Sequence, residues 1–224
     1  MLKHLPNALT CGNLLCGSVG IIFTMNYSTS MAAWFVWAAC VFDFFDGFTA
    51  RAFNVTSPIG KELDSLADMV SFGVLPSITM YQMIDIISTS TILPYSAFSL
   101  TVFSALRLAK FNVDENQKDI FIGLPTPANA LFITSLVYLS SPWDIFISND
   151  LLLVAITIIF SLLLVSPWEL FALKFKTYRW ADNKLRFTFL ALSVLLLVIG
   201  RAAALPFIIL FYILLSLLIR RVRI

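Results

Sequence analysis

Charged side chains are scarce in this chain of 224 residues, where Asp, Glu, Lys and Arg together make up 12%. A soluble globular domain carries about 25% charged residues, so this composition excludes an ordinary water-covered surface. Hydrophobic residues make up 59% of the chain, and its mean hydropathy is +0.90. These values are typical of a protein that lies within a lipid bilayer.

Histidine, cysteine and dense basic tracts are also rare. The three cysteines, Cys11, Cys16 and Cys40, lie in apolar segments without the paired spacing of a metal site or disulfide framework. We interpret them as free thiols in helix packing. The chain has no polybasic tract interleaved with aromatic residues, so we expect no nucleic-acid partner. The single histidine, His4, is interpreted as an interfacial residue rather than a catalytic one.

Long apolar segments, by contrast, are abundant. A helix that crosses a membrane needs about 20 mostly apolar residues, and segments of this kind predict about eight transmembrane helices. We see no internal repeat, low-complexity tract or soluble domain, so we expect an all-α integral membrane protein. The predicted spans are 9–26, 31–51, 62–88, 93–111, 125–142, 150–166, 186–200 and 204–219.

The basic residues provide an independent test of this topology. If both termini are cytoplasmic and the eight spans alternate, fourteen of the fifteen Lys and Arg residues lie on the cytoplasmic side, and only Arg201 does not. The loops on the other side carry acidic residues, namely Asp85, Asp144 and Asp150. This asymmetry is the positive-inside pattern of multi-pass membrane proteins, and it predicts a location in the cell membrane.

Four aspartates lie in the second and third predicted spans, although lipid disfavours charge. Asp43 and Asp46 are three residues apart, and Asp64 and Asp68 are four apart, so each pair projects from one helix face. The connection between the two spans is short, and we expect antiparallel neighbouring helices. The four carboxylates can then converge near the cytoplasmic end of the bundle.

The free-energy cost of charge within a membrane span indicates what these carboxylates bind. One ionised Asp within a span costs roughly 2.5–3.5 kcal/mol, and Arg51 and Lys61 are too few to neutralise four of them. Oxygen ligands without His or Cys favour Mg²⁺ or Mn²⁺ over Zn²⁺. Four carboxylates suit two divalent ions that hold a phosphoryl group. The alternative is a cation-coupled membrane transporter, although such proteins bind at the midplane and contain repeats.

Three small residues lie on the same faces as the aspartates. Gly47, Ala50 and Gly60 leave the facing helix surfaces bare, which gives a nucleotide diphosphate room to reach the metal ions. The alternative is that they serve only close helix contact.

These residues together form a spaced pattern that resembles the signature of the CDP-alcohol phosphatidyltransferase family. It matches that signature at every fixed position, over 26 residues. The resemblance implies a six-helix core over residues 1–166, and residues 167–224 would add a basic cytoplasmic loop and two further transmembrane helices. The pattern reads Asp43-x2-Asp46-Gly47-x2-Ala50-Arg51-x8-Gly60-x3-Asp64-x3-Asp68.

The resemblance also implies roles for individual residues. The metal ligands would be Asp43, Asp46, Asp64 and Asp68, and Asp68 would also be the general base. CDP-diacylglycerol would be bound by Pro6, Asn7, Thr10, Asn13, Gly47, Ala50, Arg51, Ser57 and Gly60. Two ions, Mg²⁺ or Mn²⁺, would occupy each site, CMP would be released, and the chain would form a homodimer.

Three further segments resemble the phosphatidylserine synthase branch of this family, which implies L-serine as the acceptor. They begin at Leu5, Leu63 and Arg107, and the third includes the tract 123–127. Arg107 and Lys110 would bind the serine carboxylate, or both would be positive-inside anchors. The tract 123–127 would be a turn leading into a helix or part of the acceptor pocket. Glycerol 3-phosphate, an inositol phosphate, or an archaeal lipid donor remain alternatives with the same chemistry.

Overall fold

The computed structural model describes residues 4–55, 57–113, 121–170 and 180–222. Helices account for nearly all of this part of the chain, together with one two-residue pair of strands. The α-helices are α1 (Leu5–Asn26), α2 (Met31–Ala52), α3 (Pro58–Asp68), α4 (Leu75–Ile87), α5 (Phe98–Val113), α6 (Thr126–Ser135), α7 (Asp150–Val165), α8 (Trp180–Gly200) and α9 (Leu205–Val222). The remaining elements are the π-helix η2 (Met69–Val74), the 3-10 helices η3 (Leu93–Ala97), η4 (Leu136–Tyr138), η5 (Trp143–Phe146) and η6 (Arg201–Ala204), and the strands β1 (Phe121–Ile122) and β2 (Glu169–Leu170).

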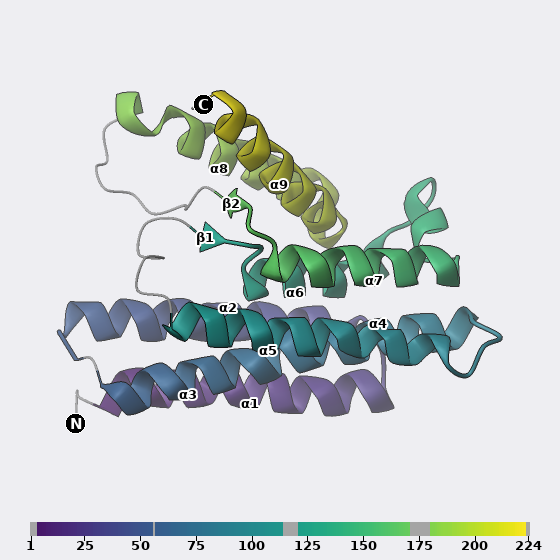
Figure 1. The fold of residues 1–224 in the computed structure, drawn as a ribbon, viewed down its shortest axis with the longest axis horizontal. Helices are drawn as coiled ribbons and strands as arrows, with labels where there is room; N and C mark the ends of the chain where they lie inside the picture. The colour runs from purple at the N-terminus through teal and green to yellow at the C-terminus, as the bar shows by residue number, and fades with distance from the viewer. Residues whose placement is uncertain (1–3, 56, 114–120, 171–179, 223–224) are drawn as a thin grey trace.

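The helices form a bundle with a C-terminal hairpin (Figure 1). Helices α1 to α5 run along the long axis of the molecule, and α6 and α7 lie over them. Helix α1 packs against α2, α3 and η2, while α5 packs against η2 and α7. Helices α8 and α9 fold back on each other at η6 and cross the bundle obliquely, so that both chain ends lie at the same end of the molecule.

All-α membrane architecture is therefore confirmed, with helical structure in each of the eight predicted segments. The third begins earlier than predicted, at Pro58, and the seventh begins at Trp180 rather than at 186. In the described part of the chain, four helical segments are long and apolar enough to cross a membrane: Leu5–Asn26, Met31–Ala52, Pro58–Ile87 and Asn183–Leu218. The number of crossings, eight, stays a prediction.

A break in helix type separates the two halves of the segment that begins at Pro58. Ser57 caps its start, since the Ser57 hydroxyl accepts a hydrogen bond from the Gly60 amide at 3.0 Å, and Pro58 occupies the first helical position, where its missing N–H costs nothing. Directly after Asp68 the helix widens into the π-helix η2. Such segments are rare and occur frequently at functional sites.

The close approach of α1 to η2 depends on Gly17. A Cβ atom at Gly17 would lie 2.8 Å from the Cα of Ser71, and the Ser71 hydroxyl donates a hydrogen bond to the Asn13 carbonyl at 2.9 Å. Only a residue without a side chain fits here. The helix that carries Asp64 and Asp68 is thus held directly against α1.

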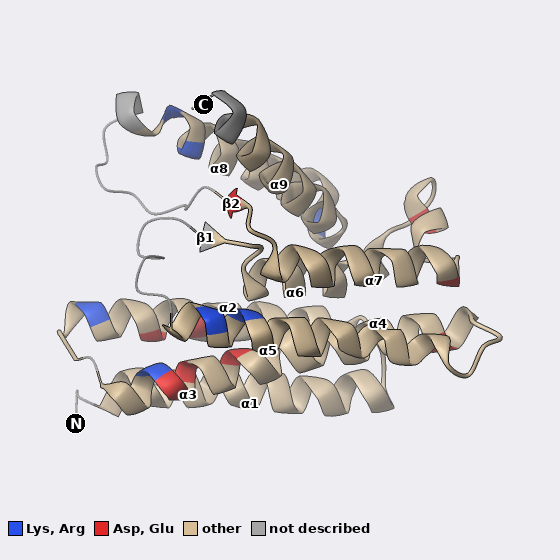
Figure 2. Cartoon of the chain, viewed as in Figure 1, with Lys and Arg blue, Asp and Glu red and all other residues tan. Residues whose placement is uncertain are grey.

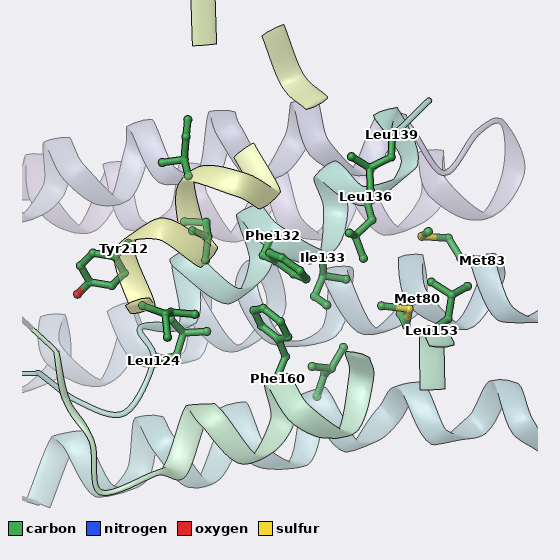
Figure 3. Packing of buried hydrophobic residues seen from close by; sticks show 14 of the residues in the cluster. Met80, Met83, Leu124, Phe132, Ile133, Leu136, Leu139, Leu153, Phe160 and Tyr212 are labelled. Carbon is green, nitrogen blue, oxygen red and sulfur yellow. The ribbon is translucent and has the colours of Figure 1, made fainter. Parts of the chain in front are cut away.

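Buried apolar side chains from α4, α5, α6, α7 and α9 form one core (Figure 3). The rings of Phe132 and Phe160 stack with their centroids 3.8 Å apart. Ile208 and Tyr212 of α9 are buried in the same cluster. Residues on both sides of the predicted boundary at 166 therefore contribute to one core, and the division into two regions stays a prediction.

Charged residues are distributed unevenly along the bundle (Figure 2). Lys and Arg gather at the end where α2 and α5 finish and α3 and α8 begin, together with the acidic residues of α2 and α3. At the opposite end, the connection between α6 and α7 and the start of α7 carry acidic residues. The pattern agrees with the predicted asymmetry for the side chains that are described. Six basic residues used in that prediction lie outside the described residues: Lys3, Lys118, Lys174, Lys176, Arg179 and Arg223. The side chains of Arg220 and Arg221 are also not described.

Candidate functional site

Three of the four aspartates form a compact cluster where α2 meets α3. One carboxylate oxygen from each of Asp43, Asp64 and Asp68 lies within 4.8 Å of the other two. Asp46, one turn after Asp43, is close enough to interact electrostatically with both Asp43 and Asp64. The helices run antiparallel across a short loop, as the sequence predicted, and this arrangement brings all four aspartates to one site.

Helix α1 orients two of these carboxylates. The Thr10 hydroxyl lies 2.7 Å from Oδ2 of Asp46, and Nδ2 of Asn13 donates a hydrogen bond to Oδ1 of Asp68 at 3.0 Å. All four of these side chains are buried. Thr10 and Asn13, which the resemblance assigned to the nucleotide, thus contact the aspartates directly.

The cluster has the composition of a divalent cation site. Oδ1 of Asp64 is buried and has no hydrogen-bond partner among the described residues, and three hard oxygen ligands meet within a few ångströms. Mg²⁺ and Mn²⁺ prefer such ligands. The ammonium group of Lys61 donates a hydrogen bond to the Asn112 carbonyl at 2.8 Å. The residues present therefore fit a metal ion.

A cleft of about 200 Å³ opens beside the aspartates, between α1, the end of α2 and the start of α3. Asp46 and Asp64 face it, and seven of the nine residues predicted to bind CDP-diacylglycerol line it: Pro6, Asn7, Thr10, Gly47, Ala50, Ser57 and Gly60. Asn13 and Arg51 do not line it. The sequence analysis missed two other lining residues, Val55 and Lys61, because a valine and a lysine near a helix start carry no signal of their own.

Small residues keep this cleft open. A Cβ atom at Gly60 would lie 3.0 Å from the Ser57 hydroxyl oxygen and 3.1 Å from Oδ1 of Asn7, which is tighter than an ordinary contact. At Gly47 the nearest atom to such a Cβ would be a guanidinium nitrogen of Arg51 at 3.4 Å. Arg51, although exposed, therefore lies at the rim beside Gly47.

The two predicted acceptor residues differ in their surroundings. Arg107 is 7% exposed, its Nη1 donates to the Thr126 hydroxyl at 3.4 Å, and its guanidinium lies over the Phe111 ring at 5.8 Å. It is near enough to Asp68 and Tyr212 to interact electrostatically with both. Lys110 is exposed, and no contact brings it to the aspartates in the described structure.

The tract 123–127 leads into α6, as one of the two open interpretations proposed. Gly123 has a φ of 77°, and its amide donates to the Trp168 carbonyl at 2.9 Å. A side chain at this position would collide with the backbone of Leu164. The same tract also includes Thr126, which accepts a hydrogen bond from Arg107. Its place in an acceptor pocket stays a prediction.

Comparison with known proteins gives one family. The sequence model of the family described as CDP-alcohol phosphatidyltransferase matches residues 3–168. The chain is 35% identical over 141 residues to the CDP-diacylglycerol–serine O-phosphatidyltransferase of Bacillus subtilis (strain 168), a region that covers 63% of this chain and 79% of that protein.

Two further relatives bear the same name. The protein of Helicobacter pylori (strain J99) is 37% identical over 146 residues, which is 64% of this chain and 61% of that protein. The protein of Methanocaldococcus jannaschii is 41% identical over 98 residues, which is 44% of this chain and 46% of that protein. Similarity to proteins of this name therefore extends across bacteria and archaea.

Proposed function

The chain belongs to the CDP-alcohol phosphatidyltransferase family, and we propose that it transfers a phosphatidyl group from CDP-diacylglycerol to L-serine. The products are phosphatidylserine and CMP. The observation that carries this proposal is the convergence of Asp43, Asp64 and Asp68 beside a cleft lined by the family's small residues. The names of the relatives support serine as the acceptor.

We assign the aspartates to metal binding, with Asp43, Asp46, Asp64 and Asp68 holding two Mg²⁺ or Mn²⁺ ions. The bound ions would offset the charge of the diphosphate and of the departing CMP. The bonds from Thr10 and Asn13 fix Asp46 and Asp68 before substrate binds. Such preorganisation reduces the rearrangement that the reaction requires.

Asp68 is the general base in this proposal. The serine hydroxyl oxygen forms a bond to the phosphorus that carries diacylglycerol, and the bond from that phosphorus to the CMP oxygen breaks. The hydroxyl proton passes to Asp68, and CMP leaves with the electron pair. Asn13 holds one oxygen of Asp68, and Arg107, the proposed ligand of the serine carboxylate, lies close to it. Serine bound to Arg107 would thus place its hydroxyl near this base.

The cleft would bind the cytidine diphosphate part of the donor, with Ser57 and Gly60 at its α3 wall and Pro6 and Asn7 at its α1 wall. Arg51 would contact the donor from the rim. Arg107, buried close to Asp68, would bind the serine carboxylate as a bidentate partner. Lys110, which is exposed, would then contribute only to the positive potential at this end.

Membrane placement follows from the same scheme. We propose a multi-pass protein of the cell membrane with both termini and the active site at the cytoplasmic side, and with a homodimer as its assembly. The charge distribution in Figure 2 supports this orientation. A membrane transporter is disfavoured, because the aspartates lie near one end of the bundle and the family transfers phosphatidyl groups.

Incorporation of labelled serine tests the reaction. Membranes that contain the protein, supplied with CDP-diacylglycerol and Mg²⁺ or Mn²⁺, are expected to convert radiolabelled L-serine to a chloroform-soluble lipid with equimolar release of CMP. Glycerol 3-phosphate and inositol phosphate serve as competing acceptors. Use of either of them while serine is ignored would refute serine as the acceptor and leave the phosphatidyl transfer intact.

A further inference from the structure

Helices α5 and α6 carry buried polar side chains that have no hydrogen-bond partner among the described residues. Both amide atoms of Asn129 and the hydroxyl of Ser104 have no hydrogen-bond partner among the described residues, and each side chain is fully buried. Nε of Arg107 is unpartnered in the same way. Buried polar groups in native proteins are nearly always satisfied, and each exception needs an explanation. Ser104, Arg107 and Asn129 differ from an isolated exception such as Ser135, because the hydrogen bond from Arg107 to Thr126 joins the helices that carry them.

These side chains are brought together by the two helices that carry them. Ser104 and Arg107 are one turn apart on α5, and Thr126 and Asn129 are one turn apart on α6, so each pair shares a helix face. The hydrogen bond from Arg107 to Thr126 joins the two faces. Helix α6 also packs on η2, the segment that directly follows Asp68.

The chemistry of the set matches an amino acid acceptor. Arg107 offers a cation for a carboxylate, but it cannot bind an ammonium group. The Asn129 carbonyl and the Ser104 hydroxyl are unpartnered acceptors on the helix faces that carry Thr126 and Arg107, and both are neutral. A zwitterion placed between a guanidinium and two neutral acceptors has both of its charges satisfied without adding net charge to the bilayer interior.

We propose that Asn129 is a specificity-determining residue that accepts a hydrogen bond from the ammonium group of L-serine, with Ser104 as a second acceptor. This inference rests on the proposed function. It provides a hydrogen-bond partner for the ammonium group of L-serine, for which neither the sequence pattern nor Arg107 provides one.

Steady-state kinetics of purified Asn129→Ala in detergent tests the assignment. The KM for L-serine is expected to rise about 10- to 100-fold, the range for loss of one hydrogen bond to a charged group. The kcat and the KM for CDP-diacylglycerol should stay within about threefold of wild type. Ser135→Ala is the matched control, because Ser135 lies on the same helix, is fully buried and has an unpartnered hydroxyl.

A second variant separates recognition from packing. Asn129→Asp keeps the size of the side chain and adds an acceptor with negative charge, so its KM for serine should lie well below that of Asn129→Ala. A higher KM in Asn129→Asp than in Asn129→Ala, or no change in KM in Asn129→Ala, would overturn the assignment. Gel filtration shows whether Asn129→Ala folds. If it does not, the KM of Asn129→Asp for L-serine is compared with that of wild type. A KM within about tenfold of wild type supports the assignment, and a larger rise overturns it.

The wild-type control distinguishes this inference from the proposed function. A wild-type protein that releases CMP with glycerol 3-phosphate and ignores serine refutes the proposed acceptor and, with it, the role of Asn129. A wild-type protein that uses serine, together with an unaffected Asn129→Ala, refutes only the role of Asn129.

Discussion

At the scale of single residues, Asp68 has the most constrained position of the four aspartates. It receives a hydrogen bond from Asn13, lies with Asp43 and Asp64 in the carboxylate cluster, and is near Arg107. The cleft is lined by Asp46 and Asp64 but not by Asp68. Asp68 therefore lies between the proposed donor side of the site and the proposed acceptor side at Arg107, where our scheme requires a base for the acceptor hydroxyl.

Replacement of Asp68 by Asn should lower kcat by about 10²- to 10⁴-fold, the usual contribution of a positioned general base. The amide keeps the size of the side chain, so folding should be preserved. CMP release from CDP-diacylglycerol measures the change. Asp85→Asn is the control, because Asp85 is exposed near the end of α4. Unchanged turnover in Asp68→Asn would remove Asp68 as the base.

Residues differ in how well the sequence predicted them. The aspartates and small residues were predictable, because charge within an apolar span has few explanations and the spacing places them on shared faces. Asn129 and Ser104 were not, since a single Asn or Ser in a transmembrane helix has no periodic pattern. Their role depends on which helix packs against α5, and only the folded chain determines that.

At the scale of elements, the contact of α1 with η2 sets the position of the site. Asn13 reaches Asp68 across a contact in which Gly17, one turn further along α1, lets α1 approach the backbone of η2. Thr10, on the same helix, reaches Asp46. The sequence predicted the span of the first helix. It did not predict the π-helix, because one extra residue in a helical turn leaves no mark in the hydrophobic pattern.

Substitution of Gly17 by Ala should destabilise the protein by about 1–3 kcal/mol, since the added methyl group overpacks against the backbone of Ser71. Thermal unfolding in detergent, followed by circular dichroism, measures the loss. Gly12→Ala is the matched comparison: there the added methyl meets the ring of Phe42, a side chain that can rotate. Equal stability of Gly17→Ala and wild type would contradict the close contact.

At the scale of the whole molecule, divalent ions are expected to control both activity and stability. Chelation should abolish CMP release, and Mg²⁺ or Mn²⁺ should restore it. Ions at about 100 times their Kd should raise the free energy of unfolding by about 2.7 kcal/mol. NaCl of equal ionic strength is the control. Full activity after rigorous chelation would refute the metal site.

Orientation in the membrane can be measured with single cysteines. In a variant without Cys11, Cys16 and Cys40, which are free thiols, new cysteines replace Lys184 or Asp144. Both positions are exposed. The elements that carry them, the first turns of α8 and the connection between α6 and α7, lie toward opposite ends of the molecule. A membrane-impermeant maleimide should label position 144 in intact cells and position 184 only after permeabilisation. The reverse pattern would contradict cytoplasmic termini.

The shared core of α4, α6, α7 and α9 has a consequence for the order of assembly during synthesis. Ile208 and Tyr212 leave the ribosome well after the aspartates, yet they complete the cluster that supports α6, and Tyr212 lies near Arg107. The proposed donor side of the site can form from the first three helices as they are inserted. The proposed acceptor side is complete only when α9 packs against it, so we expect a nascent chain to assemble its carboxylate cluster before its proposed acceptor pocket.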